Sequence, residues 1–260
     1  MDAKGDEIKR VQDLLVLIEN SKLAEKQNAH VRLWFRGQSK AGWPGSPGVY
    51  RSKLAQKTED ERLRIERHLT QDFRIECASL LPGSKDDAEL YFLQQHYRMP
   101  TRLLDWTNNP LAGLYFAVTR EPDEDAELFM MDAYMLAPCQ NAAKQFQGVM
   151  TRRNQIFQNA LQVIFNWWKP EDNFPKFVFP VRPDHFDQRI VLQKGCFTFH
   201  VPGRDCLTKS INSSLRCFRI PKDSKPVIQK ELFLLGIDIF SVYGDLESLS
   251  ERLKFAYGVR

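Results

Sequence analysis

The feature that most constrains the fold of this chain is the uneven distribution of its hydrophobic patterns. Apolar residues recur at helical spacing early in the chain, whereas strand-like runs gather later. The expected early helices are 7–20, 58–81 and about 87–97, the expected strands are 128–131, 177–181, 189–193, 196–201 and 215–220, and two further helices are expected at 228–235 and 245–256. Because helices dominate the first half and strands the second, we predict an α+β fold with an antiparallel or mixed sheet.

Two local signals interrupt this division. Residues 30–36 (HVRLWFR) read as an early strand, and residues 37–49 form a loop with four glycines and two prolines. Asn109 followed by Pro110 predicts the start of a helix that contains LAGLYFAV. No linker separates these segments, so we predict one compact domain over residues 28–260, preceded by a helical extension at 1–27.

Composition limits the functions that are open to the chain. The formal net charge of +4 is compatible with a phosphate-bearing ligand but does not require nucleic acid. Five cysteines without a CxxC pair, and no cluster of histidines, indicate free thiols in a reducing compartment and no metal site. The polar N-terminus and the absence of an 18-residue apolar run predict a cytoplasmic protein without a membrane partner.

The segment Gln94–Val118 (QQHYRMPTRLLDWTNNPLAGLYFAV) is unusually polar for a core element. Asp105 is its best candidate catalytic carboxylate, with Arg98 and Arg102 as possible partners. His96 is a candidate acid or base, and Thr101 could bond a ligand hydroxyl. We predict that Arg36, His96, Thr101 and Asp105 converge on one cleft. Each has a structural alternative, such as a buried ion pair for Asp105 or a core position for His96.

Four blocks occur in an order that resembles the FRG domain, a prokaryotic and phage-associated family. They are WFRGQS (Trp34–Ser39), the block Gln94–Val118, RIVLQKGCFTF (Arg189–Phe199) and LGIDIFSVYGDLESLSERLK (Leu235–Lys254), and together they span roughly residues 28–257. The resemblance implies a toxin or phage-defence effector, with an antitoxin or regulatory protein as a possible partner.

A second likeness is to ADP-ribosyltransferases, and it implies NAD as cofactor and a macromolecular acceptor, either protein or nucleic acid. Arg36-Gly37 would match the early Arg-Gly pair, the segment around Tyr115 the later aromatic segment, and Gln193 the late acidic residue. In that reading Arg36 and Gln193 are catalytic together with Asp105 and His96. The NAD-binding residues are Arg36, Gly37, Gln38, Thr101 and Tyr115. Gln193 is neutral where the family has a glutamate.

The residues leave other functions open. A guanidinium fork suits a diphosphate, and a tyrosine ring can stack on nicotinamide, but the same groups would serve a nucleotide- or nucleic-acid-binding module without chemistry. Arg36 could instead anchor the glycine-rich loop, Tyr115 could belong to the core, and Gln193 could satisfy a turn. A metal-dependent hydrolase or nuclease using Asp105 and His96 is the weakest alternative, because two-metal sites need several acidic ligands.

Overall fold

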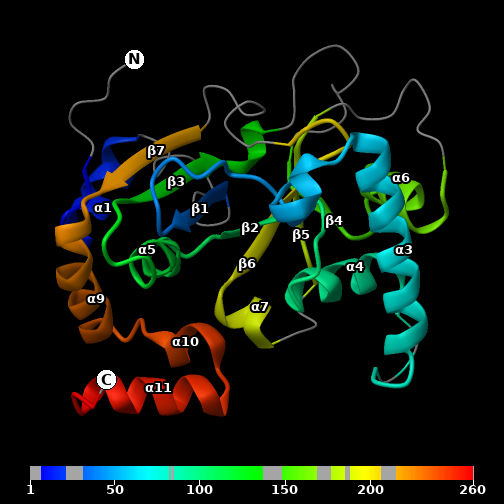
Figure 1. Ribbon diagram of the computed structural model, residues 1–260. Coiled ribbons are helices and arrows are strands. Elements are labelled where there is room, and N and C mark those ends of the chain that lie inside the picture. Colours follow the sequence, from blue (N-terminus) through cyan, green and yellow to red (C-terminus); the bar gives the residue numbers. More distant parts are fainter. Residues whose placement is uncertain are drawn as a thin grey trace.

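The computed structural model describes residues 7–21, 32–81, 83, 85–136, 148–168, 177–184, 188–205 and 215–259. The described residues form one seven-stranded sheet in the order β4-β5-β6-β2-β1-β3-β7 (Figure 1). Its strands are β1 Leu33–Gln38, β2 Leu103–Thr107, β3 Ala126–Asp132, β4 Met150–Thr151, β5 Phe179–Arg182, β6 Gly195–Phe199 and β7 Leu215–Ile220. Strands β4 and β5 are parallel and the other neighbours are antiparallel, so the sheet is mixed.

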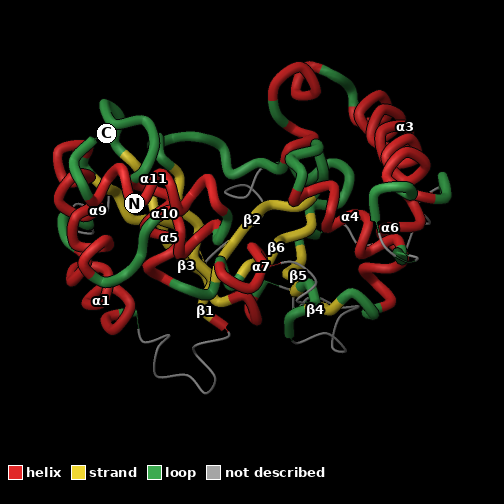
Figure 2. The backbone as a smooth tube through the Cα atoms, turned by 90° about the horizontal axis from the view of Figure 1, so that it is seen from below, coloured by secondary structure: helices red, strands yellow, loops and turns green. Residues whose placement is uncertain are grey.

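The helices form two groups over the sheet (Figure 2). Helices α1, α5 and α9 lie at one end with α10 and α11, and α3, α4 and α6 lie at the other. The described α-helices are α1 Val11–Asn20, α3 Glu59–Cys77, α4 Asp87–His96, α5 Pro110–Val118, α6 Gln155–Phe165, α7 Gln188–Leu192, α9 Lys225–Leu234, α10 Ile239–Tyr243 and α11 Leu246–Ala256. The predicted α+β class is therefore confirmed.

Alternation along the strands divides the core between the two faces of the sheet. On β1, Leu33 and Phe35 pack with α5 and α9, whereas Trp34 packs on the opposite face. On β2, Leu103 joins the cluster formed with α4 and α6, whereas Leu104 and Trp106 join Trp34. One continuous sheet thus connects all three clusters, as expected for a single compact domain.

Two glycines allow α5 to lie directly on β1. A methyl group at Gly37 would come within 2.2 Å of the Gly113 carbonyl oxygen and 2.4 Å of the Ala117 nitrogen. A methyl group at Gly113 would come within 2.8 Å of the Phe35 Cβ. The Gly37 position therefore serves the close approach of a helix, and helix packing explains the glycine that follows Arg36.

Several expected elements are confirmed, and some are not. The Asn109-Pro110 signal is correct: α5 begins at Pro110, and the Asn109 side chain accepts a hydrogen bond from the Leu111 amide at 3.1 Å. The strand expected at 189–193 is wrong, because these residues belong largely to α7. A short apolar run fits a strand and a buried helical turn equally well. Strand β2 was not predicted, and three of the strands fall in the first half of the chain.

Within the described residues, no helix combines the length and apolar character that crossing a membrane requires. The described cysteines, Cys77, Cys196 and Cys217, are all free thiols.

Candidate functional site

The site begins at a local opening in the sheet between β1 and β2. These strands pair at one position, Phe35 with Thr107, whereas β1 pairs with β3 along its whole length. Near the opening, the Arg36 Nη1 donates a hydrogen bond to the backbone carbonyl of Asp105 at 2.8 Å. The Arg36 side chain thus links β1 and β2, which share almost no backbone hydrogen bonds.

A hydrogen-bonded chain continues from Asp105 to α4. The Gln95 Nε2 donates to both carboxylate oxygens of Asp105, at 3.0 and 2.9 Å. The Thr101 hydroxyl donates to the Gln95 Oε1 and accepts from the Leu103 amide at 3.1 Å. Thr101 is buried and Asp105 is exposed. These hydrogen bonds therefore hold an accessible carboxylate, that of Asp105, against buried residues. We call Arg36, Arg51, Gln95, Thr101 and Asp105 the split-sheet cluster.

Arg51 makes this cluster rich in positive charge. Burial lowers the pKa of Arg36 to about 10; the Asp105 carboxylate opposes this shift and Arg51 adds to it. Burial also lowers the pKa of Arg51, again against the influence of Asp105. Among the described residues, the buried Arg36 Nε has no hydrogen-bond partner. An anion between these guanidinium groups would stabilise their charged forms and could accept a hydrogen bond from the Arg36 Nε.

Of the four residues expected to converge on one cleft, three share one hydrogen-bonded cluster: Arg36, Thr101 and Asp105. His96 follows Gln95 at the end of α4, and its ring packs edge-to-face on Tyr97 at 4.8 Å. Sequence reasoning missed Arg51 and Gln95. Gln95 is distinguished only by its hydrogen bonds to Asp105, and Arg51 only by its charge near Arg36 and Asp105. No spacing pattern marks either residue.

The other predicted NAD contacts lie in different surroundings. Gln38 is buried, and its Nε2 donates to the Trp43 carbonyl at 2.9 Å, which ties down the glycine-rich loop. The strand position expected for Gln193 is wrong: Gln193 lies in the turn after α7, where its carbonyl accepts from the Thr107 hydroxyl at 2.6 Å. Tyr115 lies on helix α5, packs against the buried cluster that contains Leu33 and Phe35, and lines a separate cavity.

Arg102 proves to be a structural residue and not a partner of Asp105. It is fully buried, and its Nε donates to Glu66 at 2.7 Å. Its Nη1 donates to the Tyr50 hydroxyl at 2.6 Å and lies 2.9 Å from Glu59. Burial would lower the pKa of Arg102, but the surrounding acidic groups, Glu66 above all, raise it above the usual value. Arg102 therefore joins β2 to α3 as a permanent cation.

A buried histidine, His200, directly follows strand β6. The two ring nitrogens of His200 contact the Thr198 hydroxyl at 3.2 Å and the Arg204 carbonyl at 2.9 Å. The Trp106 Nε1 donates to the same Thr198 hydroxyl at 3.1 Å. Burial lowers the pKa of His200 to about 3, and Arg36 and Arg102 contribute to the lowering. His200 is thus neutral near pH 7 and serves as a structural support.

His200 gives a testable pH dependence. Its folded pKa lies below the unfolded value of 6.5, so the folded state resists protonation that the unfolded chain accepts. The contribution of His200 to the free energy of unfolding is therefore fully present above pH 6.5. It falls by about 1.4 kcal/mol per pH unit as the pH drops from 6.5 toward 3. In urea titrations between pH 7 and 5, His200→Gln should flatten this slope, and His68→Gln, at an exposed histidine, should not. Equal slopes in wild type and His200→Gln would contradict the assignment.

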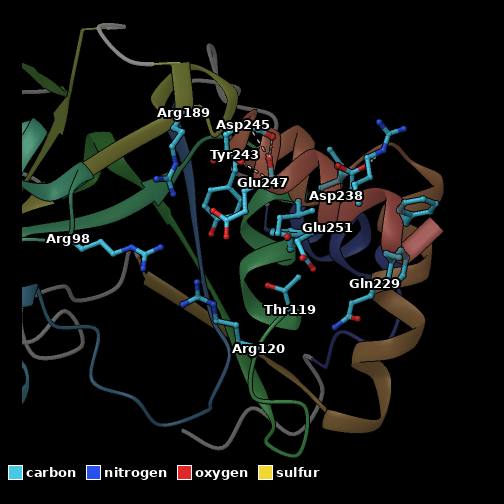
Figure 3. A pocket seen from close by; sticks show the side chains of 17 residues that line it. Arg98, Thr119, Arg120, Arg189, Gln229, Asp238, Tyr243, Asp245, Glu247 and Glu251 are labelled. Atoms are coloured by element: carbon cyan, nitrogen blue, oxygen red, sulfur yellow. Dashed lines mark hydrogen bonds and ion pairs between the residues drawn. The ribbon is translucent and has the colours of Figure 1, made fainter. Parts of the chain in front are cut away.

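A cavity of about 670 Å³ lies apart from the split-sheet cluster, between α5 and the C-terminal helices (Figure 3). Its described lining residues include Tyr115 and also Arg98, which was predicted as a possible partner of Asp105. The described residues contain no group of three or more histidine, cysteine, aspartate or glutamate side chains that could hold a metal ion.

The fold and the cluster define an α+β protein with a locally opened sheet and an arginine-rich polar site. Residues 31–126 match the family model of the FRG domain, which confirms the resemblance over this segment. The match contains Arg36, the Gly37–Gly113 contact and the Arg102 network. The later blocks, Arg189–Phe199 and Leu235–Lys254, lie outside it. Comparison with curated proteins and with solved structures found no match.

Proposed function

We propose that the protein binds a nucleotide, with NAD as the ligand, through the split-sheet cluster. The observation that carries this proposal is the buried Arg36 Nε, which has no hydrogen-bond partner among the described residues. Arg36 and Arg51 also lie near a single carboxylate, Asp105, which leaves one of the two cations without a matching negative charge. A diphosphate supplies that charge and fits the fork geometry of arginine. The exposed Asp105 carboxylate beside the arginines can accept a ribose hydroxyl.

The stronger form of the proposal is ADP-ribosyl transfer to a macromolecule, protein or nucleic acid, in a toxin or phage-defence setting. In this reaction the bond between ribose and nicotinamide breaks, nicotinamide leaves with the electron pair, and the acceptor bonds to the ribose carbon and releases its proton. The ribose gains positive character during the transfer, and a carboxylate stabilises it. Asp105 is the carboxylate of the cluster, which gives it the role that the neutral Gln193 fills poorly.

Binding without chemistry is the second candidate. The positions of Gln193 in a turn and of Tyr115 on a helix favour it, because the transferase likeness expects both residues on strands. The two candidates differ in one measurable product, free nicotinamide.

Arg36→Ala should weaken NAD binding by about one to two orders of magnitude, because a charge-assisted hydrogen bond is worth roughly 1.5–3 kcal/mol. Isothermal titration with NAD measures this loss, and Arg153→Ala, at an exposed arginine, is the control. Melting temperatures identify any variant that fails because it unfolds.

Nicotinamide release in the presence of cell extract then separates the two candidates. Transfer predicts release by wild type, with Asp105→Asn at least tenfold slower and Gln193→Glu equal or faster. NAD binding without release supports the binding module. Absence of NAD binding by folded wild-type protein would refute both forms.

A further inference from the structure

The cavity between α5 and the C-terminal helices is lined by residues that the proposed function does not use. Tyr115 and Thr119 line it from α5, Arg189 from α7, and residues of α9, α10 and α11 close it (Figure 3). It shares no described lining residue with the split-sheet cluster. Its volume of about 670 Å³ lies within the range of small-molecule sites, roughly 300–1,000 Å³.

Three arginines supply one side of this cavity. Arg98 and Arg120 are exposed and make no side-chain hydrogen bond or ion pair with another described residue. Arg189 lies over the Tyr243 ring, 4.6 Å from its centroid, which holds that guanidinium in place. Arg98 follows α4 with a φ of 62°, in the left-handed region that favours glycine.

The acidic lining residues are mostly bonded to protein groups already. Asp238 lies 3.1 Å from the Arg252 Nε, Asp245 accepts from the Ser248 amide at 2.7 Å, and Glu251 accepts from the Lys254 Nζ at 2.7 Å. Asp245 keeps its negative charge, because an amide donor is neutral, and Arg189 is close enough to help lower its pKa. With Asp238 paired to Arg252 and Glu251 to Lys254, the lining leaves three arginines, Arg98, Arg120 and Arg189, against two carboxylates, Asp245 and Glu247, which is a small positive excess. Figure 3 shows Arg98 and Arg120 reaching the cavity from one side, whereas Glu247 and Glu251 project from α11.

We infer that this cavity binds a small organic phosphate of the nucleoside monophosphate class. Arg98, Arg120 and Arg189 would hold the phosphate, since guanidinium groups bind phosphate oxygens through paired hydrogen bonds. Tyr115 and Tyr243 offer ring surface to a planar base. Glu247, exposed on α11, is placed to accept sugar hydroxyls.

Isothermal titration with four probes tests the inference: AMP, adenosine, ribose 5-phosphate and inorganic phosphate. AMP should bind, and adenosine should bind at least about tenfold more weakly because it lacks the phosphate. The double variant Arg98→Gln/Arg120→Gln should lose at least about tenfold in AMP affinity while keeping its melting temperature. The matched control, Arg64→Gln/Arg153→Gln, removes the same charge from exposed positions elsewhere and should bind AMP like wild type.

Three results would overturn the inference. They are no binding of any phosphate-bearing probe by wild type, equal AMP affinity in the double variant, and equal affinity for adenosine and AMP. Arg36→Ala separates this site from the proposed function and should keep wild-type AMP affinity. If Arg36→Ala loses AMP and the double variant retains it, AMP occupies the split-sheet cluster and the cavity proposal fails. If Arg36→Ala loses NAD binding but keeps AMP binding, the result supports the proposed function and is consistent with AMP binding in the cavity.

Discussion

Replacing Arg102 with methionine should lower the free energy of unfolding by about 3–5 kcal/mol, measured by urea denaturation at pH 7. The guanidinium is fully buried and bonds Glu66 at 2.7 Å, so its removal leaves a buried carboxylate without its cation. The Tyr91 hydroxyl, which donates to the same carboxylate at 2.7 Å, cannot replace that charge. The matched control, Arg153→Met, changes an exposed arginine and should cost less than about 0.5 kcal/mol.

Two further measurements identify the cause of this loss. The double variant Arg102→Met/Glu66→Leu should be more stable than Arg102→Met, because it removes the unpaired charge as well. Burial already raises the pKa of Glu66, and loss of Arg102 raises it further. The deficit of Arg102→Met should therefore be smallest near pH 4.5 and grow as pH rises. If the loss of unfolding free energy in Arg102→Met does not change with pH and is equal in the double variant, lost packing and not charge is responsible.

The sequence predicted the fold class because the long periodic segments form the elements that their periods indicate. Helices α3 and α4 begin beside Thr58 and Asp86, whose side chains accept hydrogen bonds from Glu61 and Glu89 amides. Strand β2 was missed because it is only five residues long and its sequence, LLDWT, includes an exposed aspartate. Only its pairing with β6 defines it as a strand.

The candidate site was predicted in part for a similar reason. Arg36 and Asp105 stand out in the sequence because charged residues interrupt apolar strands, and the structure brings them together. Arg51 joins them from the end of the glycine-rich loop, 15 positions after Arg36 in the sequence, and no periodic pattern encodes where a loop ends. Arg102 looked like a site residue for the same reason as Arg36, and only its burial with Glu66 identifies it as structural.

The Gly37→Ala substitution is expected to destabilise the protein by about 3 kcal/mol, at the upper end of overpacking effects. Its Cβ would meet the Gly113 oxygen at 2.2 Å and the Ala117 nitrogen at 2.4 Å. Both atoms belong to the backbone of α5, so no side-chain rotation can make room. The helix must move off β1 and carry its own Leu114 away from Phe35, although these two residues lie in the same buried cluster.

Gly195→Ala is the matched control, because Gly195 also lies on a strand and its added Cβ would stay 3.6 Å from the nearest atom. It should change the free energy of unfolding by less than about 1 kcal/mol. Gly113→Ala is a further test: in an unpacked helix alanine is favoured by about 1 kcal/mol, whereas contact with the Phe35 Cβ at 2.8 Å predicts a loss. If Gly37→Ala unfolds at the wild-type urea midpoint, α5 can shift at little cost. The glycine after Arg36 would then have to be explained by a ligand and not by the helix.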